Sequence, residues 1–219
     1  MNIAVAITTA PRPVPTLNKS IQSFRQAGFD EKIHIFADGI SPEVEDQNVS
    51  IIVNEPKLEE LANWFSALDY LLSLNTDWVM LIQDDATWAK NSKKQLEKDL
   101  EHVSKLPDVG FYSLFTHRTV YKRLPKETGI HCINREYRGD GAVCYVFPRD
   151  AAMKLAEEPA NRQWHTKRNT DNVVSGRLND MGYNTYYRIP SMINHTLGSA
   201  NSSLKPKSPD DTPSWVESF

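Results

Sequence analysis

The sequence predicts a single α/β domain, with a Rossmann-like, mostly parallel central sheet flanked by helices. Short apolar segments alternate with segments of helical periodicity in the first half of the chain, which is typical of parallel α/β folds. One apolar segment, residues 78–82, has no polar residue, as expected for a central strand that is covered on both faces. The length of 219 residues suits one domain with a full core, and no internal repeat or linker divides the chain.

Each expected element of the first half is bounded by residues that interrupt regular structure. The first strand ends at a proline-rich segment, because proline supports neither a helix interior nor ladder pairing. Thr16 then caps an amphipathic helix, which ends at Gly28, and the second strand ends at Asp38 and Gly39. The expected elements are strand 2–8, a helix between residues 16 and 28, strands 32–37 and 49–53, helix 57–74 and strand 78–82.

The second half of the chain is less regular. A charged helix and a strand are followed by a long polar segment, and the last helix ends at Gly182. The expected elements are helix 92–105, strand 109–115, strand 142–147, helices 148–158 and 170–181, and strand 184–189. Residues from 198 onward are rich in Ser, Pro and Asp and predict a mobile tail. We assign residues 1–205 to the domain and 206–219 to this tail.

The composition excludes several classes of protein. No run of about 18 apolar residues is present, as a membrane-spanning helix requires. The first residues lack the charged and apolar regions of a signal peptide. We therefore expect a cytoplasmic protein without a membrane span. In that setting Cys132 and Cys144 are interpreted as reduced thiols, since neither has a Cys or His neighbour at metal-ligand spacing.

The net charge of −3 conceals an asymmetry between an acidic first half and a basic second half. The basic surplus is densest between residues 117 and 138. Its members are His117, Arg118, Lys122, Arg123, Lys126, Arg135 and Arg138. Such a segment is either a solvated loop or the contact surface for an anionic partner, and the sequence leaves both interpretations open.

The strongest chemical signal is the acidic pair that follows the apolar strand, Asp84 and Asp85, preceded by Gln83. Ligands of open parallel sheets bind beyond the carboxyl ends of the strands. Two adjacent carboxylates there repel each other unless a positive group lies beside them, and a hard divalent cation with a diphosphate is a natural partner. The alternative is that both residues only cap a turn.

This arrangement resembles the GT-A glycosyltransferases, which carry an acidic DxD-type motif at the end of a central apolar strand. Here Gln83 replaces the first acid of the motif. The resemblance implies that Asp85 binds Mn²⁺ or Mg²⁺ directly and that Asp84 contacts the ribose. It extends over most of the chain, because further segments match the family in the same order.

The resemblance also implies a nucleotide site and an acceptor site. The loop after the first strand, the end of the second strand, the helix at residues 57–74 and the tail would contact the nucleotide. The residues concerned are Thr8, Thr9, Arg12, Asp38, Asn63 and Lys205. The turn of small residues before strand 142–147 would form the floor of the acceptor site, through Gly139, Asp140 and Gly141. Closure of the tail, with Lys205 and Lys207, over the diphosphate is a further expectation.

Two polar residues complete the expected chemistry. Asp171 lies where inverting members hold the catalytic base, although Thr170 replaces a Glu of the family pattern. A carboxylate at a helix N-terminus is stabilised by the helix dipole, and it could accept the proton of an acceptor hydroxyl. The alternative is a simple N-cap. His195 follows the last strand, where the family often completes the metal site, and it is otherwise a structural residue.

The sequence therefore predicts a metal-dependent glycosyltransferase that moves a sugar from a nucleotide diphosphate, with UDP the expected nucleotide, to an acceptor hydroxyl with inversion. The acceptor is a surface glycan or its precursor, or alternatively a hydroxylated base of phage-type DNA, flipped out of the duplex. A non-catalytic nucleotide- or glycan-binding module is an alternative of another class. A nucleotidyltransferase is disfavoured, because residues 8–15 contain no Gly.

Overall fold

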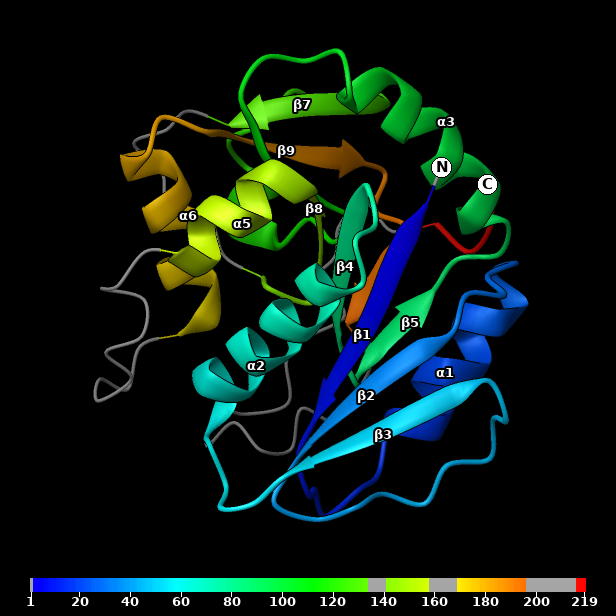
Figure 1. Ribbon diagram of the computed structural model, residues 1–219. Coiled ribbons are helices and arrows are strands. Elements are labelled where there is room, and N and C mark those ends of the chain that lie inside the picture. Colours follow the sequence, from blue (N-terminus) through cyan, green and yellow to red (C-terminus); the bar gives the residue numbers. More distant parts are fainter. Residues whose placement is uncertain (1, 134–140, 158–168, 196–215) are drawn as a thin grey trace.

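The computed structural model describes residues 2–133, 141–157, 169–195 and 216–219. Its main feature is an eight-stranded sheet with the order β3-β2-β1-β4-β8-β6-β9-β7 (Figure 1). The strands are β1 (Ile3–Thr9), β2 (Ile33–Asp38), β3 (Val49–Asn54), β4 (Trp78–Gln83), β6 (Val109–Ser113), β7 (Gly129–Ile133), β8 (Cys144–Pro148) and β9 (Asn184–Ile189).

The sheet is mostly parallel, which confirms the predicted fold class. β3, β2, β1 and β4 run in one direction. β8 is antiparallel to both of its neighbours, β4 and β6, while β6 and β9 are parallel and β7 is antiparallel to β9. The apolar strand β4 lies in the middle of the sheet, as its sequence predicted.

Helices cover both faces of the sheet, and each face has its own hydrophobic core. The helices are α1 (Leu17–Gln26), α2 (Glu60–Ser73), α3 (Ser92–Val103), α4 (Arg118–Tyr121), α5 (Arg149–Glu157) and α6 (Thr170–Asp180). In β1, Val5 and Ile7 pack with α1 and α3 on one face, and Ala4 and Ala6 pack with α2, α5 and α6 on the other. This alternation follows from the two-residue period of a strand. In Figure 1 the second group of helices lies in front of the sheet.

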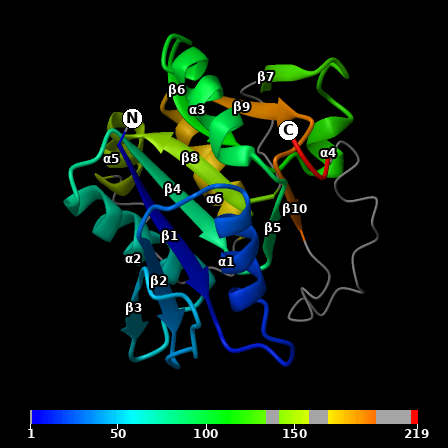
Figure 2. The ribbon, with the colours of Figure 1, turned by 90° about the vertical axis from the view of Figure 1, so that its right-hand side faces the viewer.

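Four short elements were not expected from the sequence: α4, β7, β5 (Ala86–Trp88) and β10 (Ile193–His195). β5 and β10 form a small antiparallel sheet, seen side by side in Figure 2. Each has three residues, so neither has a periodic pattern long enough to read. Their pairing brings His195 beside Ala86, directly after the acidic pair.

The helix expected at residues 57–74 begins later, at Glu60. The reason lies in Asp38, whose carboxylate accepts hydrogen bonds from the backbone N–H groups of Leu58 (2.6 Å) and Glu59 (3.0 Å). Glu59 has φ of 72° and therefore cannot belong to the helix. The expected strand 142–147 likewise begins later, at Cys144.

The last four residues pack against the start of α3. Backbone hydrogen bonds join Lys90 to Glu217 (2.9 Å) and Phe219 to Lys90 (3.0 Å), and the Phe219 ring lies 5.1 Å from the guanidinium of Arg188. Residues 206–215 of the expected tail lie outside the described residues, so its closure stays a prediction. Within the described residues, Cys132 and Cys144 form no disulfide, and no helix has the length and apolar character to cross a membrane.

Candidate active site

A cavity of about 840 Å³ lies at the carboxyl ends of the parallel strands β1, β2 and β4. Nine of the residues predicted for the site line it: Thr8, Thr9, Arg12, Asp38, Asn63, Asp85, Gly141, Asp171 and His195. Asp84 lies next to Asp85, behind this surface. The predicted residues Gly139, Asp140 and Lys205 lie outside the part of the chain that the structure describes. Seven separate segments thus meet at one edge of the sheet.

The acidic pair is buried and neutralised by an arginine. The side chains of Asp84 and Asp85 are 2% and 3% exposed, and the guanidinium of Arg12 donates to both. One nitrogen bonds Oδ1 of Asp84, and the other lies 3.0 Å from Oδ2 of Asp85. Thr9 Oγ1 donates to the second oxygen of Asp84 at 2.5 Å. Arg12, which lies on another loop, forms ion pairs with both carboxylates, so the two residues do more than cap a turn.

The two carboxylates differ in their affinity for protons. Burial raises the pKa of Asp84 to about 6, against the opposing effects of the Arg12 charge and the Thr9 hydrogen bond. Burial also raises the pKa of Asp85, but the hydrogen bond and charge of His195, together with Arg12, outweigh it and lower the pKa. Asp85 therefore stays ionised to a lower pH than Asp84.

Asp85 and His195 form a pair of ligands of the kind that Mn²⁺ accepts. His195 Nε2 lies 3.0 Å from Oδ2 of Asp85, and its side chain is 10% exposed. A carboxylate oxygen and an imidazole nitrogen suit a divalent cation of this type. Among the described residues, no third His, Cys, Asp or Glu joins them in a metal-binding group. The donor set fits a cation whose remaining ligands come from diphosphate and water.

Asp171 is fixed at the opposite wall of the cavity. It lies in the first turn of α6, where its Oδ2 accepts the backbone N–H of Gly141 at 2.9 Å. Gly141 has φ of +96°, and a Cβ there would lie only 2.7 Å from the ring of Phe115. Only glycine fits this position. The segment that leads into β8 can therefore pass close to Phe115 while the N–H of Gly141 orients the carboxylate of Asp171.

The structure adds a second carboxylate near Asp171. Glu60, the first residue of α2, also lines the cavity, and its Oε1 accepts a hydrogen bond from Thr170 Oγ1 at 2.8 Å. No pattern in the sequence predicts this contact, because the two residues lie 110 positions apart. Thr170 replaces a Glu of the family pattern, and in the structure Glu60, from another helix, places a carboxylate beside it.

Two predicted nucleotide residues also have structural partners. Both oxygens of Asp38 accept backbone N–H groups before α2, as described above. Asn63 donates to the carbonyl oxygen of Phe36 (3.1 Å) and accepts from Asn54 (2.7 Å), which ties α2 to β2 and β3. Both residues line the cavity, and both shape the walls that a ligand would meet.

Phe115 and His117 line the cavity and were not predicted as site residues. They follow β6, a strand that runs in the same direction as β4, so the rule that sites form beyond strand carboxyl ends would have found them. His117 also begins α4, and its ring accepts the backbone N–H of Thr119. The basic segment therefore starts at the rim of the cavity.

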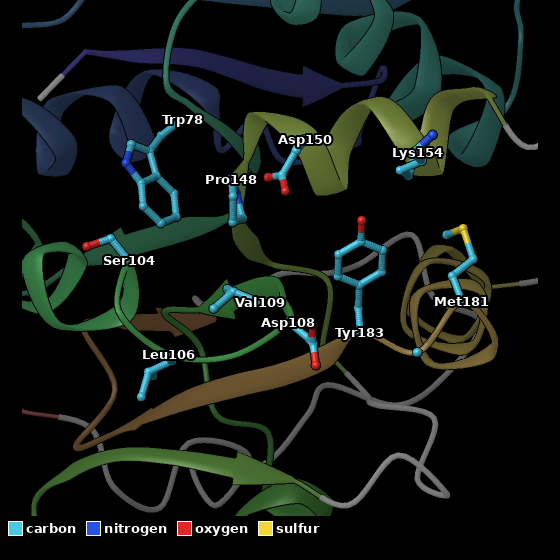
Figure 3. Close-up of a pocket in the computed structure, with 11 residues that line it drawn as sticks. Trp78, Ser104, Leu106, Asp108, Val109, Pro148, Asp150, Lys154, Met181 and Tyr183 are labelled. Atoms are coloured by element: carbon cyan, nitrogen blue, oxygen red, sulfur yellow. The ribbon is translucent and has the colours of Figure 1, made fainter.

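A second cavity, of about 720 Å³, lies at the opposite edge of the sheet (Figure 3). Its lining comes from the ends of α3, α6 and β8, from the first turns of α5, and from the starts of β4, β6 and β9. The residues are Trp78, Ser104, Leu106, Asp108, Val109, Pro148, Asp150, Lys154, Met181, Gly182 and Tyr183. Figure 3 shows Asp150 and Tyr183 pointing into the gap from opposite sides. Asp108, Asp150 and Lys154 are exposed, and none of the predicted site residues is here.

Known proteins resemble this chain in fold alone. No protein-family model and no curated protein sequence matches it. Among solved structures, a mannosyltransferase from Pyrobaculum calidifontis in complex with GDP-Man and Mn²⁺ is similar with a TM-score of 0.57 and 11% identity. The similarity covers 84% of this chain and 53% of that one, so this chain spans about half of its length. The protein A197 from STIV has a TM-score of 0.51 and 12% identity, over 90% of this chain and 86% of that one.

Proposed function

We propose that the protein is a metal-dependent glycosyltransferase that uses a nucleotide diphosphate sugar. The observation that carries the proposal is the single cavity in which a buried acidic pair, a histidine and a fixed carboxylate converge. The fold it shares with a mannosyltransferase bound to GDP-Man and Mn²⁺ supports the same assignment. UDP is the nucleotide we favour, and GDP is the alternative that this neighbour suggests.

On the donor side, Asp85 and His195 would hold Mn²⁺ or Mg²⁺, and Asp84 would contact the ribose once one of its bonds to Arg12 and Thr9 is released. The chemistry that such a cation supplies is neutralisation of the charge that develops on the leaving diphosphate. Thr8, Thr9 and Arg12 come from the loop after β1, which would wrap around the nucleotide. Asp38 and Asn63 form the wall on the α2 side, where the base and its ribose would lie.

On the acceptor side, Asp171 would take the proton of the acceptor hydroxyl as that oxygen attacks the anomeric carbon. The N–H groups of Gly141 and Asn172 each donate to one oxygen of this carboxylate, at 2.9 Å, and so hold it in one orientation. A single displacement of this kind inverts the anomeric configuration. Gly139 and Asp140 belong to the same proposed acceptor site.

A screen of nucleotide sugars by thermal shift, with and without Mn²⁺, tests the proposal. A ligand that binds the folded protein alone raises the melting temperature by mass action. We expect one nucleotide sugar to raise it and EDTA to remove the effect. Stabilisation without any release of nucleotide would instead identify a non-catalytic binding module, and no stabilisation by any donor would contradict the proposal.

For the acceptor we favour a glycan or its precursor, and the rim of the cavity favours DNA as a second candidate. His117 lines the cavity, and four exposed basic side chains follow it in α4 and in the segment just after it: Arg118, Lys122, Arg123 and Lys126. Cations placed this way could bind the phosphates of a duplex.

The salt dependence of binding separates the two acceptors. If the rim binds DNA, each neutralised phosphate contributes about −0.9 to the slope of log affinity against log salt concentration. Reversing the charges of Arg118, Lys122 and Arg123 together should flatten that slope and leave donor hydrolysis unchanged. Fluorescence titration with duplex DNA at several salt concentrations measures it. No association at low salt would rule out the DNA acceptor.

A further inference from the structure

We propose that Arg12 is a built-in counter-ion that leaves the acidic pair when a divalent cation binds and then binds the diphosphate of the donor. This inference rests on the proposed function and adds a step to it. Until the cation arrives, the guanidinium takes its place in neutralising two buried carboxylates. Buried carboxylates without a partner are strongly destabilising, so some cation must always be present.

The first step of the argument is competition for one oxygen. Oδ2 of Asp85 is 3.0 Å from the Arg12 nitrogen and 3.0 Å from His195 Nε2. A cation held by Asp85 and His195 would need this same carboxylate. Water screens charges only weakly in a buried site, so like charges repel strongly there. The guanidinium and the cation therefore cannot both keep their contacts with Asp85. Binding of the cation must therefore displace Arg12 from Asp85.

The second step is that Arg12 has a donor ready for another ligand. Its Nε is buried and has no hydrogen-bond partner among the described residues. A buried donor without a partner is costly, and it is expected where a ligand supplies the acceptor. Arg12 also lines the cavity beside the acidic pair. A diphosphate fits both facts, because a guanidinium forms paired hydrogen bonds with phosphate oxygens.

The third step concerns the loop that carries the arginine. Arg12 lies between Pro11 and Pro13, which restrict the backbone on both sides. The backbone is therefore held in place, and the long side chain makes the movement. This arrangement predicts that the cation and the nucleotide strengthen each other's binding, since the cation releases the group that the diphosphate requires.

Arg12→Gln tests the exchange through binding rather than turnover. Without the competing guanidinium, Mn²⁺ alone, measured by electron paramagnetic resonance, should bind about tenfold more tightly or better than it binds the wild type. UDP and GDP, tested in turn by calorimetry with saturating Mn²⁺, should bind about tenfold more weakly. Arg12→Lys keeps the charge without the planar fork and should give intermediate values.

Lys57→Gln is the matched control. Lys57 lines the same cavity, but its nitrogen pairs with Glu59 at 3.8 Å and lies on a 55% exposed side chain. Its loss should change the Mn²⁺ affinity less than about twofold, because exposed charges are well screened. If Arg12→Gln is too unstable for titration, the rise in its melting temperature with Mn²⁺ should exceed that of the wild type.

The outcomes separate the inference from the proposed function. If the wild type binds nucleotide in a Mn²⁺-dependent manner and Arg12→Gln matches it in both affinities, the exchange is wrong and the function stands. Opposite shifts in the two affinities support the exchange. If neither protein binds Mn²⁺ with or without nucleotide, metal dependence itself is contradicted.

Discussion

The two edges of the central sheet carry cavities of similar size but opposite character. At the carboxyl edge, charged groups are buried and paired across segments, as with Arg12 and the acidic pair. At the amino edge, Asp108, Asp150 and Lys154 are exposed to water. Burial of charge is costly and is retained where a site uses it, whereas exposed charge costs little. This difference in the burial of charge, rather than the small difference in volume, marks the carboxyl-edge cavity as the candidate site.

The largest effect is expected from the same substitution made at both edges. Asp85→Asn removes a proposed cation ligand, which is worth several kcal/mol and lowers turnover by about 10³-fold or more. Asp150→Asn changes an exposed carboxylate of the other cavity and should leave turnover unchanged. Release of nucleotide diphosphate from the donor measures both. Equal rates for the wild type and Asp85→Asn, or full activity in EDTA, would reject the metal site.

A smaller effect is expected at the opposite wall of the carboxyl-edge cavity. Asp171→Asn keeps the shape and the hydrogen bond from Gly141 but cannot accept a proton. Turnover should fall by about 10²-fold, in the range of general-base contributions, while the donor affinity stays nearly constant. Nuclear magnetic resonance of the product gives the anomeric configuration. Retention of configuration would contradict the single displacement, whatever the mutant does.

Two glycines extend the comparison. Gly141→Ala at the carboxyl edge would push against the Phe115 ring and disturb the N–H that holds Asp171, so turnover should fall by about tenfold. Gly110→Ala at the amino edge would place its Cβ 3.0 Å from that of Tyr183. That change should cost about 1–3 kcal/mol of stability and leave donor binding intact. A loss of function in Gly110→Ala equal to that in Gly141→Ala would remove the contrast.

The last prediction concerns how the free energy of unfolding depends on pH. Burial raises the pKa of Asp84 to about 6, above the ordinary value of 3.8, so the folded protein holds this proton more tightly than the unfolded chain. In EDTA, the free energy of unfolding should therefore fall as the pH rises from about 4 to about 6, by at most about 3 kcal/mol.

Asp84→Asn should lack this contribution, and Asp150→Asn should keep it. Urea unfolding at several pH values measures the three proteins. Identical slopes for the wild type and Asp84→Asn would mean that the buried carboxylate does not retain its proton in the folded state.

The sequence predicted the fold well where periodicity was long, and residues that it placed at strand ends line one cavity in the structure. Residues 78–82 indicated a central strand, and Asp84, Asp85 and Asp38 follow strand ends, so the sheet rule placed them together. It could not predict β5 and β10, because three residues carry no period and because their pairing joins residues 86–88 to residues 193–195, about half the chain apart. The contact of Glu60 with Thr170 and that of Gly141 with Phe115 depend on packing between distant segments. Arg12 was expected to contact the nucleotide, and only the structure shows it bound to the acidic pair.

The reversed direction of β8 has a consequence for how such a protein can change. Gln83 leaves β4 at the same edge where Val143 leads into β8, and the two are joined by a backbone hydrogen bond of 2.8 Å. One side of the cavity is therefore built from strand ends and the other from the segment that enters a strand. Segments at the entry side can be exchanged or lengthened without altering the register of β1 and β4. In the proposed glycosyltransferase, new acceptors could thus be acquired by replacing the loop on the entry side, while the proposed donor side of the cavity stays unchanged.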